Sequence, residues 1–316
     1  MLHSVWALTA GIVIVLFARE RYHLVLWVVL FLALAWASTL YFGRTVFADG
    51  AAPGLVHELT SYVTRALYQE TLFFLLPFYA YSTVVDSPNV LFVVLLGGLA
   101  VVSCIDLLFD RWLRTRPVFA LTFFAIVTFA AINLLLPLIA GLQPRFAAPA
   151  AALLAIGAAA PLALRSAPKT LGGRMRLMAA AVVLLVVAVG LPSLIPPVPL
   201  RLQRATFASG FEPGSHVLAD TLPDPATLGQ VSGALVVLAE VFAPSALPAN
   251  IRLEWWRDGE LLRVSREVGI TAHAEGFRVW DAWRPDSGSV LPGHYRVILR
   301  TSGRRVFGVA TITVGG

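Results

Sequence analysis

Three polar side chains lie within or beside long apolar stretches of this sequence: Glu70, Asp106 and Asn133. Ionisable side chains at membrane depth are costly and often belong to ion or proton pathways. A proton relay would need further acids near the middle of the same stretches, and we find none there. We therefore expect Asp106 to pair with a neighbouring arginine, Asn133 to form an interhelical hydrogen bond, and Glu70 to begin a helix.

A second group of candidate residues is aromatic and lies in the last third of the chain. Side chains alternate between the two faces of a strand, so neighbouring Trp255 and Trp256 cannot both face a core. Ile251 and Leu253 share the face of Trp255, which turns Trp256 outward. An outward aromatic ring can stack on a sugar ring or bind a partner protein, or can simply be covered by arginine side chains or a membrane surface. The candidate binding residues are Trp256, Trp280, Trp283 and Arg252.

The sequence offers no recognisable catalytic or metal constellation. His216, His273 and His294 lie on separate segments without ligand spacing, and no nucleophile motif of the Gly-x-Ser-x-Gly type is present. The single cysteine, Cys104, excludes an intrachain disulfide and a cysteine-based metal site. We therefore predict no catalytic residues, no metal and no cofactor.

The elements that position these residues divide the chain into two parts. The chain is 58% hydrophobic and only 13% charged, whereas soluble proteins have roughly 25% charged residues. About seven apolar segments in residues 1–196 approach the length that spans a bilayer. These segments are 2–18, 23–42, 71–85, 90–108, 119–142, 147–164 and 177–195. They predict a transmembrane helical bundle, and the helical period of 55–67 predicts either an interfacial amphipathic helix or an extension of the third span.

Basic residues in short loops predict the orientation of the bundle. The segments 111–116 and 165–176 both carry several arginines, and such loops stay in the cytoplasm. The C-terminal part is then outside the cytoplasm of a bacterial-type inner membrane. Arg19 and Arg21 also fall on the outer side in this arrangement, so the topology of the first two segments stays open.

The C-terminal part has the pattern of strands and turns. Prolines at 196, 197 and 199 close the last apolar segment, and residues 197–205 form a predicted linker. Alternating segments follow at roughly 8–12-residue spacing, with Asp258-Gly259 as a hairpin turn. This spacing predicts one soluble β-sandwich over residues 206–316.

Several short segments of this part carry a resemblance: 253–259, 276–280, 292–297 and Gly308. In this order they look like a bacterial family of uncharacterised membrane proteins with a C-terminal Ig-like β-sandwich, here over about residues 200–316. The hydrophobic half that precedes them also fits that arrangement. The resemblance implies an Ig-like fold and no known activity. Asp281 departs from the pattern, where a small hydroxyl residue is expected.

The function expected from these features is a membrane scaffold or binding protein rather than an enzyme. Its expected partners are the lipid bilayer and an envelope glycan or another membrane or envelope protein. Nucleic acid is excluded because no basic stripe accompanies the net charge of +6. One alternative is an enzyme acting on a lipid-linked phosphate, using Glu58, Glu70 and Asp110 beside arginines. A small transporter is the other, and it would need broken helices that meet at the midplane.

Overall fold

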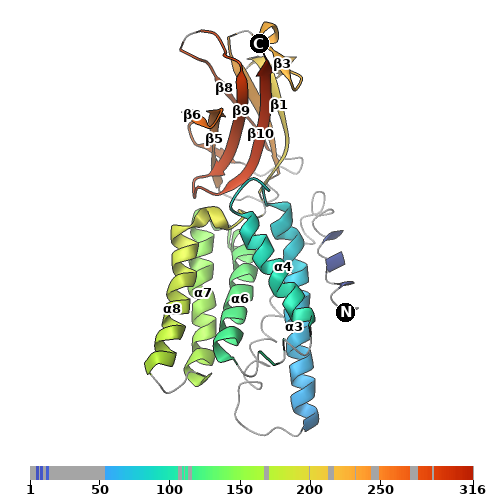
Figure 1. Ribbon diagram of the computed structural model, residues 1–316, viewed down its shortest axis with the longest axis vertical. Coiled ribbons are helices and arrows are strands. Elements are labelled where there is room, and N and C mark those ends of the chain that lie inside the picture. Colours follow the sequence, from blue (N-terminus) through green and yellow to red (C-terminus); the bar gives the residue numbers. More distant parts are fainter. Residues whose placement is uncertain are drawn as a thin grey trace.

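The computed structural model describes residues 5–6, 8–9, 12–13, 54–105, 109, 111–112, 116–166, 171–198, 200–212, 217–231, 233–242, 249–270, 277–286 and 288–315. Helices form one end of the molecule and strands form the other (Figure 1). The main helices are α3 (Gly54–Tyr81), α4 (Val90–Cys104), α6 (Pro117–Ala140), α7 (Pro144–Ser166) and α8 (Leu171–Gly190). They are joined to the strands by a 3₁₀ turn, η1 (Pro192–Leu194).

The prediction of about seven transmembrane helices is wrong. Within the described residues, one stretch, Val118–Pro137 of α6, is long and apolar enough to cross a membrane, and 61% of its best window is buried. Helix α4 has 15 residues and at 1.5 Å per residue is shorter than the roughly 30 Å hydrocarbon core. Helix α8 begins Gly172-Gly173-Arg174, which leaves the shorter apolar run Ala181–Gly190.

The other predicted segments differ for separate reasons. The amphipathic stretch and the third apolar segment form one continuous helix, α3, of 28 residues, so the extension alternative is the one that the structure shows. Segment 23–42 lies outside the described residues, as does most of segment 2–18.

The helices share one hydrophobic core. Leu72 and Leu75 of α3 pack with Leu96 of α4 and with aromatic side chains of α6 such as Phe123. Helix α7 contributes alanines, including Ala148 and Ala152, whose small side chains allow close approach of the helices.

The strand end contains two sheets. The strands are β1 (Arg201–Glu212), β2 (Val217–Thr221), β3 (Ala226–Thr227), β4 (Leu235–Phe242), β5 (Ala249–Arg257), β6 (Glu260–Val264), β7 (Val268–Ile270), β8 (Phe277–Trp283), β9 (Gly293–Thr301) and β10 (Val306–Gly315), with a 3₁₀ turn, η2 (Leu228–Gln230). The first sheet has the order β2-β1-β4-β8, and the second has the order β3-β10-β9-β5-β6 with β7 on β5. The short pair β3–β10 is parallel, so the second sheet is mixed.

Both sheets contribute to a single core. Phe207 of β1 meets Trp255 of β5 edge-on, with ring centroids 6.3 Å apart. The predicted β-rich C-terminal part is confirmed at this level. The Asp258-Gly259 turn joins β5 to β6 with positive φ at both residues, 49° and 91°, as a two-residue hairpin turn requires. Residues 201–205, assigned to the linker from sequence, already belong to β1.

The β-rich part packs directly on the helix ends. The Asn89 side chain, between α3 and α4, donates from Nδ2 to the carbonyl oxygen of Val306, with N and O 2.9 Å apart. Tyr81 contacts Phe242 edge-on at 5.8 Å between ring centroids. A Cβ at Gly303 would come within 3.3 Å of the Arg145 Cα, so the β9–β10 turn touches the start of α7. These three contacts define what we call the junction.

Candidate functional site

The strand β5 shows the predicted alternation. Trp255 is fully buried, which confirms its inward assignment. Its Nε1 donates a hydrogen bond to Asp281 Oδ2 at 2.8 Å, and Arg263 Nη2 lies 3.3 Å from Asp281 Oδ1. The carboxylate at position 281, which departs from the resembled pattern, therefore satisfies the indole N–H and an arginine from β6.

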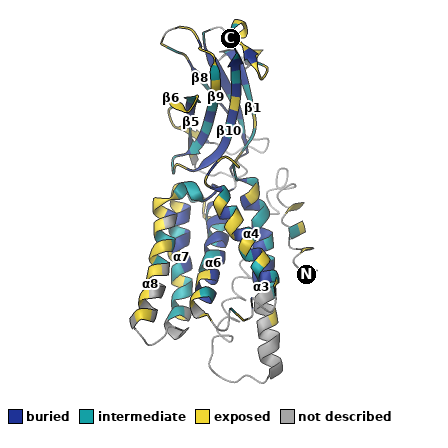
Figure 2. Cartoon of the chain, viewed as in Figure 1, coloured by how far each residue is buried: buried dark blue, intermediate teal, exposed yellow. Residues whose placement is uncertain are grey.

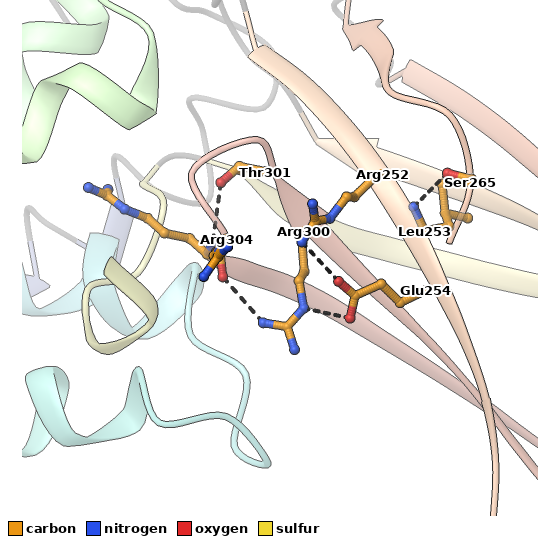
Figure 3. Close-up of polar contacts among 8 residues, drawn as sticks. Arg252, Leu253, Glu254, Ser265, Arg300, Thr301 and Arg304 are labelled. Carbon is orange, nitrogen blue, oxygen red and sulfur yellow. Dashed lines mark hydrogen bonds and ion pairs between the residues drawn. The ribbon is translucent and has the colours of Figure 1, made fainter. Parts of the chain in front are cut away.

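Arg252, on the outer face of β5, belongs to an ion-pair network (Figure 3). Its Nη2 lies 3.2 Å from Oε1 of Glu254, and Nε of Arg300 lies 2.8 Å from Oε2 of the same carboxylate. Glu254 is only 6% exposed, and a buried carboxylate of this kind needs its cations. Arg252 is therefore an ion-pair partner of Glu254 within β5, and Arg300 links the same carboxylate to β9.

The three candidate tryptophans do not form one surface. Trp256 is half-buried and points away from the core of the second sheet, opposite to Trp255. Trp280 of β8 is 44% exposed on the outer face of the first sheet and stacks on Phe211, with centroids 4.1 Å apart. Trp283 is buried and packs on Tyr295. Trp256 and Trp280 thus face opposite sides of the domain, and Trp283 is a core residue.

The polar residues of the helical part also occupy separate places. Asn133 is buried and donates from Nδ2 to the Tyr79 hydroxyl at 3.0 Å, while that hydroxyl donates to the carbonyl of Ala130 at 2.8 Å. The expected interhelical hydrogen bond of Asn133 is therefore present, between α6 and α3. Glu70 lies well inside α3 rather than at its start, because the amphipathic stretch precedes it in the same helix. Asp106 lies outside the described residues.

Sequence reasoning missed Arg305 at the junction. Its side chain is 2% exposed, and its Nε and Nη2 have no hydrogen-bond partner. Burial lowers the pKa of its guanidinium to about 10, against an opposing interaction with Tyr79. In sequence Arg305 is the second of two adjacent arginines just before a strand, and this pattern does not show which of the two side chains is buried.

Further unpartnered polar atoms accompany this arginine. The hydroxyls of Ser82 and Ser87, between α3 and α4, and Oδ1 of Asn133 are buried and have no hydrogen-bond partner. Most buried polar atoms in proteins are hydrogen-bonded, so each exception asks for an explanation. Arg305, whose unpartnered guanidinium is buried at the junction, is the strongest candidate ligand-binding residue in the described part of the chain.

The outer sides of α4, α7 and α8 carry many exposed residues (Figure 2). Exposed large apolar residues occur on α4, α7 and α8, and these are Leu91, Val94, Leu95, Val101, Leu153, Leu154, Met175, Met178, Val182, Val183, Val186 and Val189. On α8 the spacing Met175, Met178, Val182, Val186 and Val189 follows one helical face. A soluble monomer rarely exposes a continuous apolar surface of this extent.

Metal chemistry has no support within the described residues, which contain no group of three or more His, Cys, Asp or Glu side chains able to hold a metal ion. Cys104, at the end of α4, is half-buried.

Comparison with known proteins gives one match. No curated protein and no solved structure matches the chain. A family model, described as a family of unknown function (DUF5924), matches residues 1–222. The match covers all of the helical part and strands β1 and β2, whereas the resemblance noted above is carried by segments further along the chain. Because the match spans more than half of the sequence, the chain belongs to the family of unknown function DUF5924.

Proposed function

We propose that the helical part lies in a lipid bilayer and holds the β-rich part on one membrane face as a non-enzymatic binding module. The observation that carries this proposal is the apolar outer surface of α4, α7 and α8. Stretch 118–137 of α6 adds less support, because a mostly buried apolar helix also suits the core of a soluble protein. A soluble core does not explain the exposed valines and methionines along α8, because no described residue covers them.

The distribution of charge supports an orientation. The last residues of α4 and α7 and the first residues of α6 and α8 lie at the helix ends away from the strands (Figure 1). In sequence the segments that join these helices, together with the first two turns of α8, carry Arg111, Arg114, Arg116, Lys169, Arg174 and Arg176. Basic residues in short connections favour the cytoplasmic side. The β-rich part is then on the outer side of a bacterial-type inner membrane.

The exposed ring of Trp280 supports a binding role for that part. A flat aromatic side chain held on a sheet face provides apolar contact area at low conformational cost. Its stacking on Phe211 fixes the ring further. Sugar rings of an envelope glycan or the surface of a membrane-protein partner suit such a platform.

The proposal is tested by expressing the chain with alkaline phosphatase at its C-terminus in a Gram-negative bacterium. We expect the fusion in the membrane pellet after an alkaline carbonate wash, release by detergent, and phosphatase activity in intact cells. Val182→Asp with Val186→Asp should reduce recovery in the pellet, because both side chains then expose charge on the apolar face of α8. Val264→Asp on exposed β6 is the matched control and should leave recovery unchanged.

Recovery of the fusion in the soluble fraction would contradict membrane insertion. An inactive phosphatase in a membrane-bound fusion would contradict the orientation alone.

A further inference from the structure

The junction buries a positive charge that no carboxylate of the described residues neutralises. Arg305 follows the turn between β9 and β10, and its backbone is fixed there. Its N–H donates to Thr301 Oγ1 at 3.3 Å, and its carbonyl accepts from the Thr301 N–H at 2.9 Å. The next carbonyl, of Val306, accepts from Asn89. The hairpin is therefore held against the helix ends with the arginine side chain in the interior.

This guanidinium interacts with a neutral side chain rather than with a carboxylate in the described part of the chain. Tyr79 interacts with it electrostatically and is tied by a hydrogen bond to Asn133. Ser82 and Ser87 lie in the α3–α4 connection that also carries Asn89, and their buried hydroxyls have no hydrogen-bond partner. Asp86, the acid of the same connection, is exposed, and Arg305 has no ion pair with a carboxylate in the described part of the chain.

Two further arginines surround the junction from outside. Arg145 lies 4.6 Å from the ring centroid of Phe146, and Arg201 lies 4.2 Å from that of Tyr81. Paired arginine and aromatic side chains of this kind are frequent where a membrane protein meets lipid headgroups. In the orientation proposed above, the junction lies at the level of the headgroups.

From this geometry we infer that the junction binds a phosphate group, with the guanidinium of Arg305 as its principal ligand. A guanidinium with two free N–H groups is the protein group best suited to two oxygens of one phosphate. Binding would supply the negative charge that the buried arginine lacks. The phosphate source is either a phospholipid headgroup or free phosphate, and only the lipid source rests on the proposed function.

The test uses the full chain in a mild neutral detergent. Its melting temperature is measured in chloride, in inorganic phosphate at matched ionic strength, and in nanodiscs of phosphatidylglycerol or of phosphatidylcholine. We expect phosphate or phosphatidylglycerol to raise the melting temperature of the wild type by about 3–6 °C, because a ligand of the folded state stabilises it. Arg305→Met, similar in volume, should abolish the rise and weaken phosphate binding by about tenfold or more in calorimetric titration.

Arg304→Met is the matched control, since Arg304 is the exposed neighbour of the same charge, and it should keep the rise. A rise in phosphatidylglycerol alone identifies the lipid as the source, and a rise in phosphate as well shows that the free ion suffices. The inference is overturned if the wild type shows neither rise, as expected for a site filled by water, or if Arg305→Met responds like the wild type. If the chain stays soluble without detergent, the proposed membrane embedding is wrong. The melting temperatures in chloride and in phosphate would still test the phosphate site.

Discussion

At the scale of single residues, burial separates the tryptophans into three roles. Trp255 fills the core between the sheets and donates to Asp281. Trp256 covers the outer face of the second sheet, and Trp280 presents an exposed ring on the first. Each role predicts a different outcome for the same substitution, so the three alanine variants serve as controls for one another.

We expect Trp255→Ala to lower the free energy of unfolding by about 3–5 kcal/mol, because it leaves a large cavity and removes the indole donor to Asp281. Trp280→Ala should cost about 0.5 kcal/mol or less and reduce co-sedimentation of the detergent-solubilised chain with insoluble envelope glycan. Trp256→Ala should preserve co-sedimentation. Denaturant unfolding and the sedimentation assay are measured on all three variants. Unchanged co-sedimentation of Trp280→Ala would exclude this ring as the glycan contact.

At the scale of elements, close approach of the two sheets depends on Gly308 in β10. A Cβ there would overlap the Leu202 side chain of β1, at a point where the β10–β9 register shifts. Gly308→Ala should therefore lower the free energy of unfolding by about 1–3 kcal/mol, as overpacking does. Gly229→Ala is the matched control, because a Cβ at Gly229 meets nothing within 4 Å. Equal stability of the two variants would show that β1 can move away without cost.

Local patterns in the sequence predicted local structure well. Alternation at 251–256 gave the faces of β5, and Asp258-Gly259 gave the β5–β6 hairpin, because both depend on neighbouring residues only. The lengths of the apolar runs did not predict the lengths of the helices, because hydropathy does not show where a helix ends. The fourth run continues to Leu108, but α4 ends at Cys104, where Ile105 leaves helical geometry. The junction was not predictable, because its hydrogen bond from Asn89 joins residues 217 positions apart.

At the scale of the whole molecule, two hydrophobic cores meet at a polar junction. One core is formed by the helices with Ile195 and Val198, and the other begins at Leu200 and lies within the strands. Every buried apolar residue of the second core belongs to residues 200–314. What crosses between the cores is a small set of polar and aromatic contacts around Arg305 and Asn89.

This arrangement predicts that residues 200–316 fold alone. The excised fragment should be soluble, with β-type circular dichroism and a cooperative melt, because its core needs no side chain from the helices.

Excision also returns Arg305 to water, which removes the desolvation of its guanidinium. Arg305→Met should therefore leave the melting temperature of the fragment nearly unchanged, whereas in the full chain without phosphate it should raise the melting temperature by removing an unpaired buried charge. An aggregated or unfolded fragment would show that the β-rich part depends on the helix ends, and an Arg305 effect of equal size in both contexts would place its action outside the junction.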